Sequence, residues 1–243
     1  MTPTLNQRLS HRDKPDGFPV MRQRWSRLLF LHWPIEPEVI QASLPPGLTV
    51  DAFDGRAWIG VVPFFMERIR PVFCPPVPGI SWFLELNVRT YVHDEQGNSG
   101  VWFYSLDCNQ PLAVEIARRL FHLPYQHAEM KAKMEGDAVR YQCQRKGETV
   151  ATDYRYGPGG NLRTAEPGSF EFFLLERYLL FSTSRDGRIH SGQVHHVPYT
   201  FAEAECDAWS AEPIRQAGFA LPEGRPESLL YSPGVDVSVY PLR

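Results

Sequence analysis

The stretch WFLELNVRTYVH, residues 82–93, decides the fold of this 243-residue chain. Successive side chains of a β-strand point to opposite faces of the sheet, so this stretch has one apolar face and one polar face. The polar face consists of Glu85, Asn87, Arg89 and Tyr91. Two interpretations of it stay open: a solvated face of an antiparallel sheet, or a polar wall of a cavity in which a carboxylate and a guanidinium orient a ligand.

The sequence on both sides of this strand predicts more strands and few helices. Residues 24–33 read as a buried strand that Pro34 ends, and residues 48–53 and 56–65 read as a hairpin around Asp54 and Gly55. Residues 128–135 consist of helix formers but alternate strictly between apolar and charged side chains, so we predict a strand that opens a meander. Further strands are expected at residues 101–107, 138–146, 149–156, 179–184, 188–197, 201–209 and 235–241, and short helices at 37–44, 111–121, 170–178 and 212–218.

These elements predict a mainly β, β-rich α+β chain. We expect a polar tail over residues 1–22 and one domain over residues 23–243, because no linker, repeat or low-complexity segment interrupts the sequence.

Composition excludes several classes of function. The chain has 25 Lys and Arg against 28 Asp and Glu, which leaves no basic excess for a nucleic acid. No apolar run is long enough for a membrane helix or a signal peptide, so we expect no membrane partner and a cytoplasmic location. The four cysteines are scattered, which favours reduced thiols over disulfides or zinc.

No metal and no cofactor are expected. His190 and His196 share a face of their predicted strand but lie about 20 Å apart along it, which is too far for two ligands of one metal ion. His195 reads equally well as a core histidine and as a group that faces a cavity. The four lysines, which limit any amine chemistry, are Lys14, Lys131, Lys133 and Lys146.

Several tracts together resemble a known family. They are RLLFLHWPI (27–35), LPPGL (44–48), DGRAWIGVVPFFM (54–66), FLELNVRTYV (83–92), GVWFYSLD (100–107), LFHLPY (120–125), EFFLLERYLLF (171–181) and VHHVPY (194–199). As a set they resemble the YqjF-like bacterial family of unassigned function, which is grouped with the acetoacetate decarboxylase-like superfamily. The resemblance implies an antiparallel cone or barrel of strands around a central cavity, with a few short helices.

The resemblance also implies where chemistry would lie. Acetoacetate decarboxylases have a glutamate on the strand before a helix and a Pro-Lys-Lys motif after it; the first lysine forms a Schiff base and the second lowers its pKa. Glu85 matches the glutamate and Pro124 the proline, but Tyr125 and Gln126 stand in place of the lysines. We therefore predict that the chain is not an acetoacetate decarboxylase, and that Lys131 and Lys133 are solvated and do not replace the missing amines.

Three hypotheses about function follow. In the first, the cavity binds or converts a small organic acid or ketone, with Glu85, Arg89 and Tyr125 as the catalytic candidates. Its ligand-binding candidates are Arg27, Asn87, Tyr91, Tyr104 and His195. The resemblance places an arginine of the decarboxylases at either Arg24 or Arg27 and does not decide which of the two faces the cavity. In the second, the same cavity serves a non-catalytic binding or sensing module. In the third, surface aromatic residues bind a protein partner; the strand edges leave a homo-oligomer open.

Overall fold

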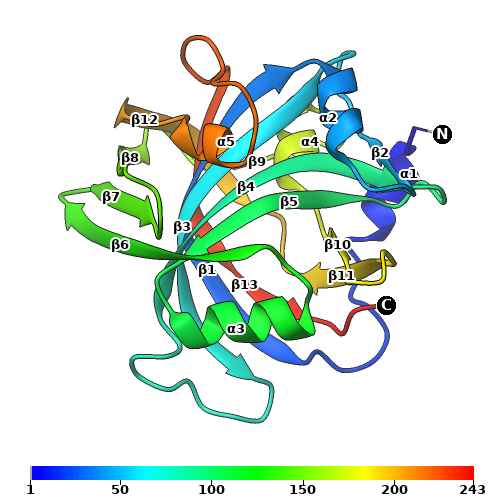
Figure 1. Cartoon of the computed structure of the whole chain (residues 1–243), viewed down its shortest axis with the longest axis horizontal. Coiled ribbons are helices and arrows are strands. Elements are labelled where there is room, and N and C mark those ends of the chain that lie inside the picture. Colours follow the sequence, from blue (N-terminus) through cyan, green and yellow to red (C-terminus); the bar gives the residue numbers. More distant parts are fainter. Residues whose placement is uncertain (1) are drawn as a thin grey trace.

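Thirteen β-strands form one sheet within residues 2–243, the part of the chain that the computed structural model describes (Figure 1). The strands are β1 (Met21–Ile35), β2 (Leu48–Val50), β3 (Ala57–Pro71), β4 (Phe83–Asp94), β5 (Ser99–Cys108), β6 (Tyr125–Glu135), β7 (Ala138–Arg145), β8 (Thr152–Pro158), β9 (Arg163–Thr164), β10 (Leu179–Thr183), β11 (Ile189–His195), β12 (Thr200–Ala208) and β13 (Ser228–Val239). The mainly β fold class predicted from the sequence is confirmed.

Five short helices accompany the sheet: α1 (Leu5–Ser10), α2 (Pro37–Ser43), α3 (Pro111–Leu120), α4 (Phe170–Leu175) and α5 (Glu212–Gln216). Prolines at the first turns of α2 and α3 fit the helix start, because proline lacks the N–H that would be unpaired there. Ser169 caps α4 by accepting a hydrogen bond from the Phe172 N–H. None of these helices has the length and apolar character that crossing a membrane requires.

The sheet curls into a ring. Its strand order is β2-β4-β3-β1-β13-β11-β10-β5-β6-β7-β8-β12-β9, and two additional pairings, β4 with β5 and β13 with β12, close it. As a result β13, β1, β3, β4 and β5 form a wall between two apolar clusters. One cluster contains α4 and residues of β11, and the other contains residues of β6, β7, β8 and β12.

The wall places alternate side chains of β4 in different surroundings. Leu84, Leu86 and Val88 belong to the cluster beside β6–β8, whereas Tyr91 belongs to the cluster around α4. β3 pairs with β4 without a register shift from Ile59 opposite Thr90 to Met66 opposite Phe83. The alternation predicted from residues 82–93 is therefore confirmed, and both faces of the strand are buried.

Other sequence predictions hold for local structure. Residues 128–135 lie within strand β6, and β6, β7 and β8 form the predicted meander. The period of the apolar side chains prevailed over helix propensity because Ala128 and Met130 pack into a core while Lys131 and Lys133 are exposed. The hairpin around residues 186–187 is confirmed as β10 paired with β11.

Two predictions about strands are wrong. β1 does not end at Pro34, which still pairs with Trp58 of β3. The pairing of β1 with β13 ends at His32, so the other edge of β1 is free at Pro34, and a proline is tolerated at a free edge. The expected hairpin between residues 48–53 and 56–65 is limited to one bridge between Phe53 and Arg56. The preceding residues, β2, pair instead with β4.

Residue 1 lies outside the described residues, and the rest of the segment expected to form a polar tail folds against the sheet. α1 begins with a capping box at Thr4, and Arg8 donates two hydrogen bonds to Asp51, at 2.5 and 2.7 Å. Arg12 forms an ion pair with Glu176 at 3.1 Å. Both carboxylates are buried, so these arginines fasten the N-terminal segment to the sheet.

Candidate functional site

Glu85 lies buried in the middle of the wall, with 3% of its surface exposed. It stands opposite Phe64 of β3 and Cys108 of β5, so its side chain points to the same side of the sheet as theirs. On that side a small cluster of Leu106, Cys108, Val114, Leu123 and Tyr125 joins the sheet to α3, which lies across one end of it (Figure 1). The solvated interpretation of this polar face is therefore wrong at Glu85.

Tyr125 meets Glu85 directly. Its hydroxyl donates a hydrogen bond of 2.6 Å to the Glu85 Oε2. β6 starts at Tyr125 and runs parallel to β5, with Tyr125 beside Leu106, and Arg118 of α3 donates to the Tyr125 carbonyl at 2.7 Å. Tyr125 and Glu85, the two residues that the resemblance singled out, are thus in contact.

The Glu85 carboxyl is neither fully ionised nor fully protonated at neutral pH. Burial raises its pKa to about 7, although hydrogen bonds from Tyr125 and Asn87 favour the charged form, and Asp107 adds a smaller repulsion. Burial and the neighbouring carboxylate raise the pKa of Tyr125 well above its ordinary value, so this phenol keeps its proton. A carboxyl group with a pKa near 7 can both accept and donate a proton at neutral pH.

Asn87 is the next side chain on the same face and is also buried, with 4% exposed. Its side chain lowers the pKa of the Glu85 carboxyl and so favours the charged form. Its Oδ1 atom is buried without a hydrogen-bond partner. Because an unpaired buried carbonyl oxygen is costly, this atom is a free acceptor in the interior.

Arg89 is the third side chain of the row and has only neutral partners. Its Nη2 donates to the Leu174 carbonyl at 3.2 Å, and its guanidinium lies over the rings of Phe30 and Tyr91, at 5.3 and 5.7 Å from their centroids. Its Nε atom is buried without a partner. Among residues 2–243 this guanidinium forms no ion pair with a carboxylate.

Tyr91 and His32 complete the surroundings of Arg89. The Tyr91 hydroxyl donates to the Leu174 carbonyl at 2.9 Å and lies 2.7 Å from the His32 Nε2. Burial and the positive charge of Arg89 lower the pKa of His32 well below its ordinary value, so this imidazole is neutral at neutral pH. A second guanidinium, that of Arg177, also lies over the Tyr91 ring, at 5.0 Å from its centroid, but it is paired with Asp51, so Arg89 is the cation here without a counter-ion.

The other candidates lie elsewhere. Arg27 lies over the ring of Phe65, which packs on the opposite side of the sheet from Phe64 and Glu85, and it pairs with Glu67 at 3.0 Å. Tyr104 also lies on that opposite side, with its hydroxyl 2.7 Å from the Ser43 Oγ. The structure brings neither of them to Glu85.

The side chains of the adjacent residues His195 and His196 lie in different surroundings, because neighbouring side chains of a strand point to opposite faces. His195 is partly exposed on β11, opposite Ser238 of β13. His196 is the buried one, stacked on Tyr178 with 4.7 Å between the ring centroids. Within residues 2–243 no group of three His, Cys, Asp or Glu side chains is arranged to hold a metal ion.

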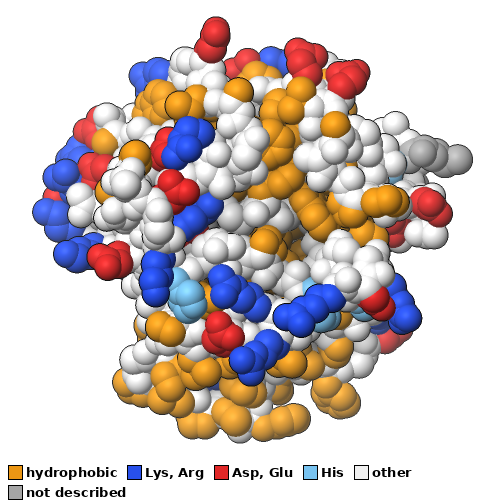
Figure 2. Space-filling view, in the orientation of Figure 1, with side chains coloured by type: hydrophobic (Ala, Val, Ile, Leu, Met, Phe, Trp, Pro, Cys, Tyr) orange, Lys and Arg blue, Asp and Glu red, His pale blue; other side chains and the backbone are white. Residues whose placement is uncertain are grey.

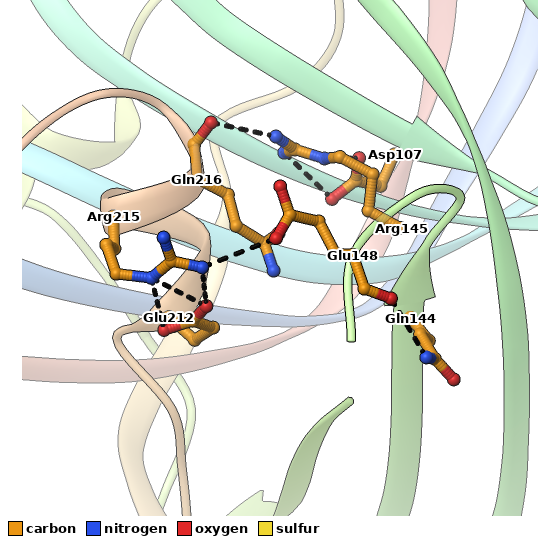
Figure 3. A network of polar contacts seen from close by, with 7 residues as sticks. All are labelled: Asp107, Gln144, Arg145, Glu148, Glu212, Arg215 and Gln216. Carbon is orange, nitrogen blue, oxygen red and sulfur yellow. Dashed lines mark hydrogen bonds and ion pairs between the residues drawn. The ribbon is translucent and has the colours of Figure 1, made fainter. Parts of the chain in front are cut away.

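Sequence reasoning missed two supports of the site. Tyr141 of β7 donates to the Glu85 carbonyl at 2.8 Å from the other side of the sheet. Asp107 pairs with Arg145 at 2.6 Å, and Arg145 also donates to the Gln216 carbonyl at 3.0 Å (Figure 3). These contacts join residues that are far apart in the chain, and no local pattern in the sequence signals them.

All four lysines of the chain are exposed: Lys14, Lys131, Lys133 and Lys146. The prediction that Lys131 and Lys133 are solvated is confirmed. A Schiff-base lysine has to be held unprotonated in a desolvated pocket, which an exposed lysine is not.

The fold is that of the acetoacetate decarboxylase-like proteins. An acetoacetate decarboxylase-like enzyme from Sphingomonas wittichii RW1 superposes with a TM-score of 0.63 at 14% identity, over 93% of each chain. The enduracididine biosynthesis enzyme MppR in complex with pyruvate superposes with a TM-score of 0.62 at 12% identity, over 95% of this chain and 92% of that one. Acetoacetate decarboxylase from Legionella pneumophila gives 0.60 at 13% identity, over 100% and 95%.

The sequence places the chain in one family within this fold. The model of DUF2071, described as an uncharacterized conserved protein, matches residues 22–236, and the chain belongs to that family. A relative, the uncharacterized protein YqjF of Bacillus subtilis (strain 168), is 40% identical over 231 residues, which cover 94% of each chain. The resemblance recognised in the sequence is confirmed.

Proposed function

We propose that the chain binds a small organic acid or ketone at Glu85 and Tyr125 and converts it without a Schiff base. The observation that carries this proposal is the 2.6 Å hydrogen bond between these two side chains in a buried site. A strongly perturbed carboxyl in the interior is the feature that favours an enzyme over a passive surface. The pyruvate complex of MppR, a structural neighbour, supports an oxo acid as the ligand class.

The chemistry that fits this pair is proton transfer at the carbon next to a carbonyl group. The ionised Glu85 would take that proton, which leaves an enolate. The protonated Glu85 would then return a proton to the carbon. Tyr125 acts as a positioning residue that orients the carboxyl and balances its two states.

Deuterium exchange tests this proposal. Pyruvate and acetone in D₂O are incubated with the protein, and the loss of their methyl proton signals is followed by NMR. We expect exchange that Glu85→Gln abolishes, whereas Arg27→Gln, on the opposite side of the sheet, leaves it unchanged. Equal exchange with wild type and Glu85→Gln would refute a role of Glu85 as the base.

A non-catalytic sensing module is the alternative at the same site. It is favoured by the Tyr125 hydroxyl, which donates to Glu85 and so is not free to protonate a ligand. Binding of pyruvate or acetone by calorimetry, together with no deuterium exchange at any pH from about 5 to 9, would identify this alternative.

A second candidate function is self-association through an apolar face. Exposed apolar side chains gather along the lower edge of the molecule in Figure 2, and they include Leu112, Ile116 and Leu120 of α3 and Phe73, Val77, Ile80 and Trp82 of the loop between β3 and β4. In an antiparallel pair of α3 helices related by a twofold axis, Glu115 of one copy would face the arginines of the other. Sedimentation equilibrium should show a dimer that Ile116→Glu dissociates; a monomeric wild type would refute this.

A further inference from the structure

Glu85 and Arg89 are too far apart to hold one small molecule between them. They are four positions apart in β4, whose pairing with β3 has no register shift there, so their Cα atoms are about 13 Å apart. The Arg89 guanidinium also lies over the ring of Tyr91, which is two residues further from Glu85. An acid as short as pyruvate or acetoacetate therefore reaches one of these groups, not both.

Apart from Asn87, the side chains between the two groups are apolar. On the same face of the sheet, Asn87 stands opposite Val62 of β3 and Leu106 of β5, and Arg89 stands opposite Gly60 and Phe103. The one polar group between the ends is the Asn87 side chain, whose Oδ1 has no partner. An extended ligand along this row would meet an acid–base group, an apolar middle and a cation.

A break in the hydrogen-bonded wall lies beside this row. β5 pairs with β10 at Val101 and Trp102 and with β6 from Leu106 to Cys108, so the residues between have no strand on that edge. Phe83, Phe103, Phe121 and Leu180 are only partly buried and contact both the cluster around α4 and the cluster beneath α3. Apolar side chains also line the middle of this side of the molecule in Figure 2.

Arg89 itself borders open space. The Arg89 side chain is partly exposed to solvent, although the residues around it are fully buried, with 0% exposure: Phe30, His32, Tyr91 and Leu174. A charged group that is partly exposed and lacks a counter-ion is suited to a carboxylate, which guanidinium binds through paired hydrogen bonds.

We infer that the natural ligand is an elongated oxo acid, with its carboxylate at Arg89, its carbonyl group at Glu85 and Tyr125, and a saturated chain of several carbons between them. This inference rests on the proposed function, because it assigns the carbonyl group to the same pair. It deepens that function by requiring a ligand longer than those of the pyruvate or acetoacetate type.

A series of methyl-ketone acids, CH₃CO(CH₂)ₙCO₂⁻ with n from 1 to 8, tests the inference by isothermal calorimetry. We expect the affinity to rise by at least tenfold from acetoacetate to a longer member, because each added methylene is buried and the carboxylate reaches Arg89 only when the chain is long enough. The methyl ester of the best acid should bind at least tenfold more weakly than the acid, because it carries no charge.

Variants separate Arg89 from other arginines. Arg89→Gln should abolish the preference of the acid over its ester, whereas Arg27→Gln should retain it. If Arg89→Gln does not fold, the comparison of acid and ester with the wild type still decides. Acetoacetate binding as tightly as every longer acid, or an ester binding as tightly as its acid, would overturn the elongated ligand and leave the proposed function intact; no binding of any member would refute both.

Discussion

Replacing Glu85 with glutamine should stabilise the protein in a pH-dependent manner. Burial raises the pKa of Glu85 from an ordinary 4.5 to about 7 in the folded chain. Between these two values the folded chain keeps a proton that the unfolded chain releases, so stability falls as the pH rises and levels off above the folded pKa. The difference between the folded and unfolded pKa values of Glu85 corresponds to roughly 3 kcal/mol, by which the free energy of unfolding of the wild type falls between these two pH values.

Glutamine has nearly the same shape and does not ionise, so it removes this loss. The difference in free energy of unfolding, Glu85→Gln minus wild type, should grow by roughly 3 kcal/mol from about pH 4 to about pH 8. Urea denaturation followed by the fluorescence of the six tryptophans measures it. Other titrating groups are common to both proteins and cancel in the difference.

Glu129→Gln is the matched control, because Glu129 is an exposed carboxylate on β6. Its difference from wild type should stay constant over the same range. A Glu85→Gln difference that is also constant, or that shrinks as the pH rises, would mean that Glu85 ionises as an exposed carboxyl does. The assignment of Glu85 as a proton acceptor near neutral pH would then fail.

Three further outcomes are expected. Tyr125→Phe removes a hydrogen bond to the charged carboxyl, so the pKa of Glu85, measured by carbon NMR of labelled glutamate, should rise by about one to two pH units; a fall would contradict the donor role of the hydroxyl. Gly60→Ala would place a methyl group 3.0 Å from the His32 Cδ2, so urea denaturation should show a loss of about 1–3 kcal/mol, and unchanged stability would contradict the close packing. Borohydride with acetoacetate should trap no adduct by mass spectrometry, since all lysines are exposed; an adduct would overturn the absence of imine chemistry.

Local alternation in the sequence predicted the faces of β4 because the side-chain period of a strand is two residues and both faces are filled. The turn motif at residues 54 and 55 did not predict the partner of β2. Residues 54 and 55 do form a tight turn, but the backbone N–H of Asp51 donates to the Tyr91 carbonyl at 2.9 Å, which commits this segment to β4. Which strand becomes the partner depends on distant contacts, and a turn motif carries no information about them.

The site was predicted in part for a similar reason. Glu85 and Tyr125 were paired through their positions in a family pattern, although 40 residues separate them. Arg27 was a ligand-binding candidate through the resemblance alone, which did not distinguish it from Arg24; it lies where the register of β1 with β3 is irregular, with a positive φ of 50°. Such a bulge shifts which residues face each side, and a loose resemblance carries no information about it.

The loss of folding stability that the buried Glu85 causes near neutral pH is itself an argument for function. A buried carboxyl that lowers stability near neutral pH would be replaced without loss by a neutral side chain if it served packing alone. Here it is held by a phenol that keeps its proton, beside an Asn87 oxygen with no partner, in a row that ends at an arginine with no counter-ion. The Asn87 oxygen and the Arg89 guanidinium each keep a hydrogen-bonding or electrostatic capacity that the protein does not satisfy itself. A ligand carboxylate supplies the opposite charge that Arg89 lacks, and we therefore expect binding of an oxo acid to raise the stability of the wild type more than that of Arg89→Gln.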